Sequence, residues 1–502
     1  MPTLADAIAA GLAIGDENPW PRRAVDFDHW RALVEELAAG RWTLLGLWGD
    51  QDAVHLALLD EAPREVAVVT HRCASGVFPS VGRLHPPAIR FERSIKDLFG
   101  LEPIGSPDLR PWLDHGRWGL RAPLGARPEL ASAALEYAFL PAEGEGVHQI
   151  PVGPVHAGVI EPGHFRFSVN GEAVVRLEER LGYAHKGVER LMMGADLERA
   201  ARLAGRVSGD STVAYALVFS RAVEAALAVE VPPRAIWLRA LMAELERLAN
   251  HFGDIGAICN DVAFALMHAH CGALRERVLR VAASCFGHRL MMDRVAPGGV
   301  SVDLAPEGVK RIRDLVGTAR RAFPPLVELY DNTASLQDRT VGAGLAEPAL
   351  VRRFGCGGYV GRASGRRFDA RRDLAYPPYD GLRFEIPTLE EGDVNARVWI
   401  RIREVEQSLA LVEQILDGLP DGPVRAPVAA GRGEGMAVVE GFRGDILAYL
   451  RLDADARIER CHLRDPSWFQ WPVLEAAIGG NIVADFPLCN KSFNCSYSGH
   501  DL

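Results

Sequence analysis

The chain has 502 residues, 48% of them apolar, and a formal net charge of −10 at pH 7. This length fits two to four domains, and the apolar content can fill a sizeable core. The negative charge argues against non-specific nucleic-acid binding, which needs a basic face to meet the phosphates, so we expect protein partners and no nucleic acid.

No stretch of the sequence is apolar enough to cross a membrane. The best candidate, residues 211–232, contains Arg221 and Glu224, which are costly in lipid. The first residues show no cationic segment leading into an apolar run, so we expect no signal peptide. Any membrane contact should therefore go through partner subunits.

The eight cysteines are scattered, and no two of them stand at the two-residue spacing of the usual zinc and iron-sulfur signatures. This usage suits a reducing cytoplasm. Cys489 and Cys495 could bind a metal together with Cys461 or His462, although buried free thiols are the commoner arrangement.

Residues 1–125 are predicted to form a first α+β domain. Apolar periodicity predicts a helix over 27–39, and short apolar runs predict strands over 42–48, 53–59 and 66–71. A further helix starting at Phe91 should end at Gly100, before a proline turn at 106–110. Residues 126–150, rich in Ala, Pro, Gly and Glu, are interpreted as a linker.

The second domain is predicted to span residues 151–502 and to begin with a hairpin over 165–181. Asn170-Gly171 supplies the positive φ of its turn. Helical periodicity then predicts helices over 196–204, 211–229, 232–253, 263–287 and 306–323, which should pack as a bundle.

Polar residues fall inside one of these helices. Glu246-Arg247 and Asn250-His251 lie one turn apart. They are interpreted as internal ion-pair and hydrogen-bond partners.

The last third of the chain mixes loops, one long helix and strands. After a loop-rich stretch at 369–391, Asp393 is predicted to cap a helix that runs to Leu416. Strands are expected over 436–439 and 445–450, after a loop marked by Gly433 and Gly435.

Several short motifs, in this order, resemble a known family. They are Gly-Pro-Val-His at 153–156, the His- and Glu-containing run at 181–190, Arg-Val-Ser-Gly-Asp-Ser at 206–211, Pro-Tyr-Asp at 378–380 and Gly-Asp-Val-Asn-Ala-Arg at 392–397. The chain is similar to the large subunit of energy-converting nickel-iron hydrogenases and to the quinone-site subunit of complex I. Residues 91–110 resemble the small docking subunit of complex I, here fused at the N-terminus.

The resemblance implies an α+β fold in which an N-terminal α+β domain precedes a hydrogenase-large-subunit-like domain with a helical bundle core and peripheral strands. In the hydrogenases, four cysteine thiolates hold the metals, because soft thiolates suit nickel and iron. At the corresponding positions, this sequence has Ser208, Ser211, Ser467 and Gln470. We therefore expect no nickel-iron centre.

The resemblance also bears on quinone chemistry. Complex I uses a His and a Tyr beside the quinone head group, and Ile160 and Gly209 stand at these positions. Neither side chain can hydrogen-bond a quinone carbonyl, so a quinone is possible only with other contacts.

Acid-base residues remain, and Glu161 matches the carboxylate that passes protons to and from the hydrogenase metal. A carboxylate in a partly dry pocket has a raised pKa that suits a proton relay. The candidate site residues are Glu161, His156, His164, His185, Arg206 and Asp465. Alternatively, Glu161 is a structural partner of Arg166 or Arg206. The resemblance also gives Glu246-Arg247 and Asn250-His251 an alternative role as parts of a buried proton path, because the family has the same pattern on the corresponding helix.

Three functions follow from the resemblance. In the first, the chain is the large core subunit of an oxidoreductase complex that couples electron transfer from an iron-sulfur partner to ion translocation. In the second, it is a non-catalytic scaffold that joins an iron-sulfur subunit to a membrane arm. The third and weakest is a hydrogenase with altered ligands.

On the first two readings, the expected partners are an iron-sulfur small subunit, a ferredoxin-like subunit and integral membrane subunits of complex I type. We expect no cofactor in this chain, with the iron-sulfur clusters in the partner subunits. Its expected place is the inner face of the cytoplasmic membrane, as a peripheral subunit.

Overall fold

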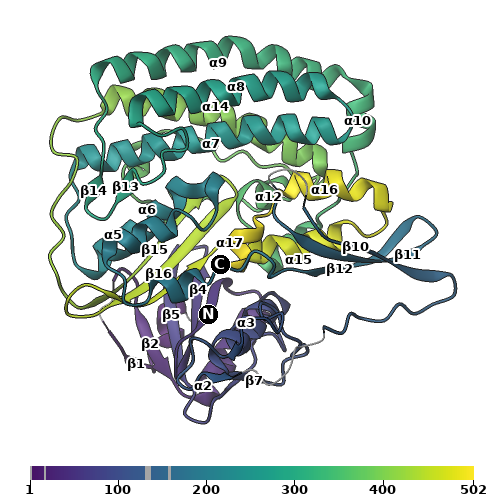
Figure 1. Ribbon diagram of the computed structural model, residues 1–502, viewed down its shortest axis with the longest axis vertical. Helices are drawn as coiled ribbons and strands as arrows, with labels where there is room; N and C mark the ends of the chain where they lie inside the picture. The colour runs from purple at the N-terminus through teal and green to yellow at the C-terminus, as the bar shows by residue number, and fades with distance from the viewer. Residues whose placement is uncertain (1–2, 16–17, 131–136, 157–159) are drawn as a thin grey trace.

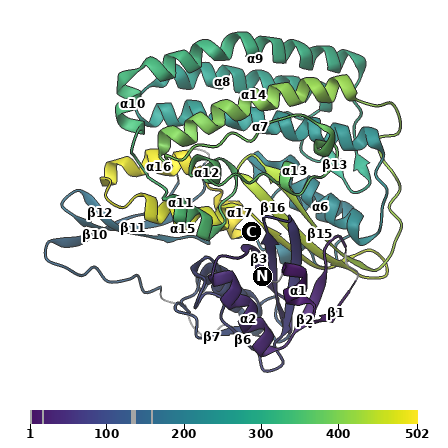
Figure 2. The same cartoon turned by 180° about the vertical axis from the view of Figure 1, so that it is seen from behind.

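The computed structural model describes residues 3–15, 18–130, 137–156 and 160–502. Long helices lie together at one end of the molecule and the N-terminal sheet at the other, with the C-terminal helices between them (Figure 1). The view from behind shows the same three levels (Figure 2). The α+β architecture expected from the sequence is confirmed.

The N-terminal domain is built on a five-stranded sheet of order β1-β2-β5-β4-β3. Within this sheet, β2 and β5 pair in parallel, and the other neighbouring strands pair antiparallel. Helix α2 (Phe27–Ala38) begins at Asp26, whose side chain accepts from the His29 N–H at 2.8 Å. The predicted strands are confirmed as β3 (Thr43–Gly49), β4 (Ala53–Asp60) and β5 (Glu65–Arg72).

Helix α3 (Ile89–Phe99) packs on β3 and ends at Gly100, which has φ of 72°, as the sequence predicted. The other elements of this part are α1 (Leu4–Ile8), β1 (Leu12–Ala13), β2 (Arg22–Val25), β6 (Val77–Pro79), η1 (Pro86–Ala88), β7 (Glu102–Ile104), β8 (Leu120–Arg121) and β9 (Glu129–Leu130).

A three-stranded arm follows, made of β10 (Val147–Val155), β11 (Gly163–Asn170) and β12 (Ala173–Arg180). The predicted hairpin is its β11–β12 pair, and Gly171 has the positive φ of the turn. Strand β10 was not predicted, because its mainly exposed residues lack an apolar alternation and begin inside the expected linker. The arm projects from the side of the molecule (Figure 1).

The bundle consists of α7 (Pro233–Asp261), α8 (Ala265–Phe286), α9 (Pro306–Asn332) and α14 (Val394–Gly418). Helix α14 starts at Asp393, whose carboxylate accepts from the Ala396 N–H at 2.7 Å, as predicted. Two helices are longer than predicted, and α9 continues through Pro324 and Pro325.

Helix α6 (Thr212–Ala226) packs mainly on the sheet β15-β16-β17 and not in the bundle, which corrects the prediction. Its strands are β15 (Gly433–Gly441), β16 (Gly444–Leu452) and β17 (Ile458–Arg464). Gly433 and Gly435 lie inside β15, and the predicted loop there was wrong. A Cβ atom at Gly435 would come 2.1 Å from the Ala222 carbonyl, so glycine lets the strand approach α6.

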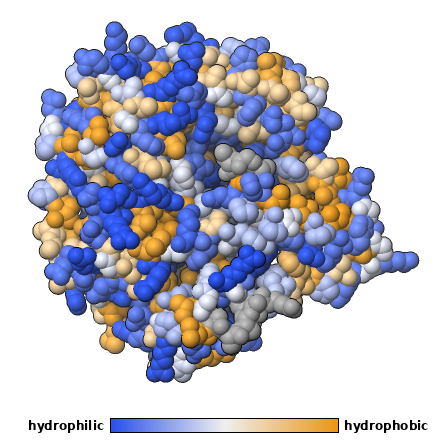
Figure 3. Space-filling model, viewed as in Figure 1, coloured by the Kyte–Doolittle hydropathy of each residue, from blue (hydrophilic) through white to orange (hydrophobic). Residues whose placement is uncertain are grey.

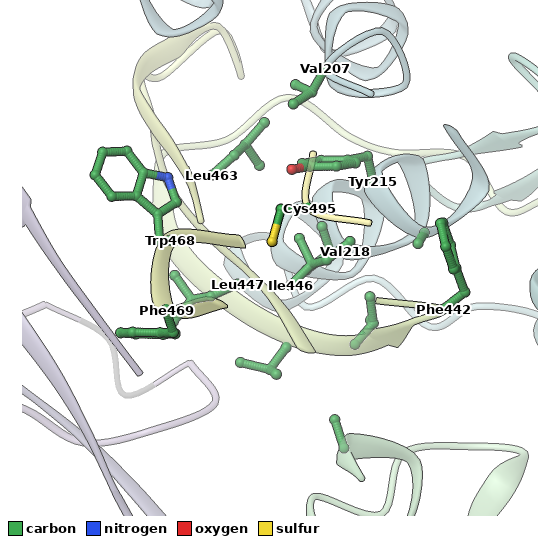
Figure 4. Packing of buried hydrophobic residues seen from close by; sticks show 14 of the residues in the cluster. Val207, Tyr215, Val218, Phe442, Ile446, Leu447, Leu463, Trp468, Phe469 and Cys495 are labelled. Atoms are coloured by element: carbon green, nitrogen blue, oxygen red, sulfur yellow. The ribbon is translucent and has the colours of Figure 1, made fainter. Parts of the chain in front are cut away.

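The C-terminal segment folds into α15 (Ser467–Ala477), α16 (Phe486–Phe493) and α17 (Tyr497–Asp501) and is largely buried. Cys495 lies among apolar side chains of α6, β16 and α15 (Figure 4). The remaining elements are α4 (Val188–Met192), α5 (Leu197–Ala204), η2 (Gly209–Ser211), β13 (Val295–Ala296), β14 (Gly299–Val300), α10 (Ala334–Thr340), α11 (Pro348–Phe354), α12 (Gly358–Ala363), α13 (Ala370–Asp373), η3 (Tyr379–Gly381) and η4 (Val483–Asp485).

Candidate functional site

The buried C-terminal segment meets the loop at 206–211, and the two form a polar cluster. The Ser208 hydroxyl lies 2.9 Å from the Ser496 hydroxyl and donates to Asp210 Oδ1 at 2.8 Å. The Ser496 N–H donates to the Ser467 hydroxyl at 2.8 Å. The structure thus brings Ser208 and Ser467 together through Ser496, the residue that faces Ser208 directly.

Arg443, from the β15–β16 turn, lies at the centre of this cluster. Its guanidinium makes two hydrogen bonds to Asp210, Nη1 to Oδ1 at 2.8 Å and Nη2 to Oδ2 at 2.6 Å, and donates to the Ser211 hydroxyl at 3.2 Å. Burial alone would raise the pKa of Asp210, but Arg443 and the Ser208 hydroxyl hold it below its usual value.

Gln470 closes the other side of the cluster. Its amide donates to the Arg443 carbonyl at 2.8 Å and to the Gly357 carbonyl at 3.3 Å. The Cys495 thiol donates to the amide oxygen of Gln470 at 3.9 Å. Burial raises the pKa of Cys495 well above its usual value, so this cysteine is a thiol at neutral pH.

The residues of the cluster do not fit a nickel-iron centre. They offer hydroxyl and amide oxygens where soft thiolates are needed, and the Arg443 guanidinium would repel a divalent cation. Within the described residues, no group of three or more His, Cys, Asp or Glu side chains is placed to hold a metal ion. Cys461, Cys489 and Cys495 are buried free thiols.

Glu161 lies near this cluster, two residues before β11 begins. Its Oε2 atom accepts from the Ser498 N–H at 2.7 Å. Lys186 is an electrostatic neighbour of Glu161, and its ammonium donates to the Val207 carbonyl at 3.0 Å. Burial lowers the pKa of Lys186, and Glu161 and Asp501 oppose this shift. Among the described residues, Glu161 forms no hydrogen bond or ion pair with either predicted partner, Arg166 or Arg206.

Asp465 is buried beside the cluster. Its Oδ2 atom accepts from the Tyr215 hydroxyl at 2.6 Å, and its Oδ1 atom accepts from the Ser467 N–H at 2.8 Å. Burial and the Asp465 carboxylate raise the pKa of Tyr215 well above its usual value. Asp465 therefore positions the turn that opens α15 and holds Tyr215 as a neutral donor.

The predicted histidines lie at different depths. His185 Nδ1 bonds the Asp501 carbonyl at 2.7 Å, and its ring stacks on Trp118 with centroids 4.8 Å apart. His164 is buried and bonds the Gly153 carbonyl through Nδ1 at 3.0 Å, and burial lowers its pKa. His156 is exposed at the end of β10.

Arg206 is exposed and faces away from the cluster. Its guanidinium pairs with Asp293 at 2.6 and 2.8 Å, at the surface. The structure therefore does not bring Arg206 together with Asp465. Of the two predicted quinone-site positions, Ile160 is half-buried and Gly209 is exposed.

A second polar group lies between α7 and α14. Glu404 accepts from His251 Nε2 at 2.7 Å and from Arg362 Nε at 2.8 Å. Burial alone would raise the pKa of Glu404, but Arg362 and His251 hold it well below its usual value. The same burial lowers the pKa of His251, which is therefore neutral at pH 7.

This group continues through Arg371, which pairs with Glu244 at 2.8 Å and with Asp369 at 2.7 Å. Arg362 also lies 3.0 Å from Glu440. Burial and Asp369 raise the pKa of Glu440 to about 8. With Glu440 neutral at pH 7, the charges of Glu244, Glu404 and Asp369 balance those of Arg247, Arg362 and Arg371.

Glu246 and Asn250 connect helix α7 to the cluster. Glu246 accepts from the N–H groups of Val213 and Ala214, at 2.7 and 3.1 Å, in the first turn of α6. Asn250 donates to the carbonyls of Asp210 and Glu246, at 2.7 and 2.9 Å. The predicted residues thus make internal pairs, and a proton path through them stays a prediction.

Arg443, Asp210 and Ser496 were missed in the sequence. Asp210 and Arg443 are 233 positions apart, so no local pattern links them. The only signal was the place of Asp210 inside the 206–211 motif, between the two serines.

Comparison with known proteins finds two family models that match different parts of the chain. Residues 26–130 match the model of the family "Respiratory-chain NADH dehydrogenase, 30 Kd subunit". Residues 261–432 and 427–501 match the model of the family "Respiratory-chain NADH dehydrogenase, 49 Kd subunit".

Formate hydrogenlyase subunit 5 of Escherichia coli (strain K12) is 31% identical over 84% of this chain and 77% of its own length. Hydrogenase-4 component G of the same organism is 32% identical over 89% of this chain and 80% of its own length. A chain from the solved structure of the membrane-bound sulfane sulfur reductase, an archaeal respiratory membrane complex, aligns with a TM-score of 0.68 and 28% identity. It covers 71% of this chain and 99% of its own. The chain therefore belongs to the family of large subunits shared by hydrogenase complexes and respiratory NADH dehydrogenase, with the 30 kDa-type and 49 kDa-type domains in one polypeptide.

Proposed function

We propose that this chain is the large core subunit of a membrane-associated, hydrogenase-related oxidoreductase complex. It takes part in coupling electron transfer from an iron-sulfur partner to ion translocation, without a nickel-iron centre of its own. The observation that supports the absence of a nickel-iron centre is the Arg443–Asp210 ion pair. This pair lies among the side chains that stand at the family's thiolate positions.

The proposed partners are an iron-sulfur small subunit, a ferredoxin-like subunit and integral membrane subunits of complex I type. Their presence is supported by the related proteins. Two of these are named as a subunit of formate hydrogenlyase and a component of hydrogenase-4, and a third comes from a respiratory membrane complex. Among the described residues, no helix is both long and apolar enough to cross a membrane. We propose that these partners hold the chain at the inner face of the cytoplasmic membrane.

The projecting arm supplies a surface for one of the partners. Strand β10 pairs only with β11, so its other edge is open within the described residues. Val155 and Val175 are 45% and 59% exposed on the arm, and Ile482 beside β12 is 40% exposed. In Figure 3, hydrophobic residues gather on the side of the molecule from which the arm projects. Such an open edge and apolar residues favour docking of another chain.

The scaffold function stays as the second candidate, because the polar cluster is internally hydrogen-bonded. Ser208, Ser496 and Ser467 already satisfy one another. A subunit that only joins an iron-sulfur protein to a membrane arm needs no more than this. The two functions differ in whether Glu161 moves protons.

Affinity purification of the tagged chain from detergent-solubilised membranes of its own host tests the complex. We expect integral membrane subunits and iron-containing subunits to co-purify in fixed ratio, with the iron in those partners. Recovery of the chain alone, with all its genomic neighbours expressed, would remove both the enzyme and the scaffold proposals.

A further inference from the structure

A buried group of two carboxylates and one guanidinium lies where the N-terminal domain packs on the second domain. Glu179 comes from β12, Glu475 from α15 and Arg90 from α3. Arg90 Nη2 lies 2.7 Å from Glu475 Oε2, and Arg90 Nη1 lies 3.4 Å from Glu179 Oε2. One guanidinium therefore serves two carboxylates, and none of the candidate site residues belongs to this group.

The neighbouring arginines are engaged with other groups. Arg110 pairs with Glu178 at 2.6 Å, and Arg180 donates to backbone carbonyl groups. Among the described residues, Arg90 is thus the one cation that pairs with either carboxylate of the group. With both carboxylates ionised, two negative charges would face one positive charge.

The other titratable side chains around the group cannot supply the missing positive charge. They are Tyr137, Cys495, Tyr497 and His500. Burial raises the pKa of Cys495 and Tyr497 and lowers that of His500, so these three side chains are neutral at pH 7. The second carboxylate is therefore left without a counter-charge.

The two glutamates differ in burial and in their hydrogen bonds. The Glu179 side chain is fully buried, whereas that of Glu475 is 21% exposed. Glu475 Oε1 accepts from the Glu179 N–H at 2.7 Å, so both oxygens of Glu475 have donors. Glu179 Oε1 has no hydrogen-bond partner among the described residues. A buried anion with an unpaired oxygen is costly, so ionisation is less favourable for Glu179 than for Glu475.

The pKa shifts of the two carboxyls agree with this difference. Burial and the Glu475 carboxylate raise the pKa of Glu179 well above its usual value, and Arg90 only partly opposes them. Burial also raises the pKa of Glu475, which Arg90 and the Glu179 N–H oppose. Two carboxyls that interact in this way lose their protons in two separate steps.

We propose that Glu179 and Glu475 form a proton-binding site that holds one exchangeable proton at neutral pH, with Glu179 as the neutral acid and Glu475 ionised beside Arg90. Water reaches the partly exposed Glu475, where the proton can enter and leave. Loss of the proton would place a negative charge close to Cys495 and Tyr497, whose pKa values the ionised Glu179 raises in addition to burial. The proposal concerns this chain alone and is independent of the redox function.

Infrared difference spectra of the intact chain at pH 7 test the site, because the C=O stretch of a protonated carboxylic acid lies apart from the amide bands. The variants are Glu179→Gln, Glu475→Gln and the double variant. We expect each single variant to lose the signal of one carboxylic acid per chain, because the remaining carboxylate has Arg90 to itself and ionises. The double variant should lose no more than either single variant. In D2O the lost signal should be found shifted in the parent, because the proton exchanges.

Glu178→Gln, on the same strand, is the matched control and should lose no such signal, because Arg110 already pairs with this carboxylate. Unchanged signals in both single variants would mean that both glutamates are ionised and would overturn the proposal. So would loss of two carboxylic acids in the double variant, or a parent signal that does not shift in D2O. If Glu179→Gln does not fold, the comparison of Glu475→Gln with the control still decides.

Discussion

A few side chains decide what the polar cluster can do. Ser208, Ser211, Ser467 and Gln470 were identified from the sequence, because each stands in a motif. Arg443 could not be identified, because its role depends on the β15–β16 turn reaching a loop more than two hundred residues earlier. The loss of the thiolates was therefore predictable, but the guanidinium beside their positions was not.

Glu161 separates a catalytic subunit from a scaffold. Glu161→Gln keeps an acceptor for the Ser498 N–H, so the chain should fold normally. If Glu161 transfers protons, turnover of the complex should fall by about 10²- to 10⁴-fold. Glu230→Gln, at an exposed position, is the control and should leave turnover unchanged. Full activity of Glu161→Gln in the purified complex would favour the scaffold.

Asp210→Asn should destabilise the fold by about 2–3 kcal/mol, because it leaves the buried Arg443 guanidinium without its carboxylate. Asp293→Asn is the matched control, since its partner Arg206 lies on the same loop as Asp210 but at the surface, where exposed pairs contribute about 1 kcal/mol or less. Denaturant unfolding of both variants measures the difference. Equal losses would show that the Arg443 pair is not buried in solution.

Among the elements, long helices were easier to predict than strands. Helices α7, α8 and α14 carry apolar residues at helical spacing, so their existence followed from periodicity. The element against which each helix packs did not follow from periodicity. Helices α5 and α6 show the same apolar spacing, yet of the two only α6 packs mainly on the sheet β15-β16-β17. The two glycines Gly433 and Gly435 led us to predict a loop. Their actual role, which is to let strand β15 approach helix α6 closely, is visible only in three dimensions.

Glu246 should make stability depend on pH. Burial raises its pKa to about 8 in the folded chain, against an ordinary value of 4.5. Between these values the folded state binds more protons than the unfolded state, so the free energy of unfolding falls as pH rises. The slope from this site is at most about 1.4 kcal/mol per pH unit, and it vanishes above about pH 8.

Denaturant unfolding of the parent chain and Glu246→Gln from pH 5 to pH 9 checks this. The free energy of unfolding of Glu246→Gln minus that of the parent chain should rise steadily with pH up to about pH 8 and then stay constant. A pH-independent difference would show that Glu246 is already ionised across this range.

For the whole molecule, the order of the motifs was sufficient to predict the family and the fusion of two units. It was not sufficient to predict how the units meet. The C-terminal segment passes between the bundle and the N-terminal domain (Figure 2), and Trp112 Nε1 donates to His500 Nε2 at 3.2 Å across 388 positions. Contacts at such separation leave no trace in local periodicity.

We propose that this chain forms the core of a hydrogenase-related complex without a nickel-iron centre. Metal analysis of the affinity-purified complex tests it most directly, as moles of nickel and iron per mole of this chain. We predict iron from the partner subunits and no stoichiometric nickel, because hydroxyl and amide groups beside a guanidinium cannot replace four thiolates. One mole of nickel per mole of this chain would show that the complex holds a nickel centre and would overturn the proposal.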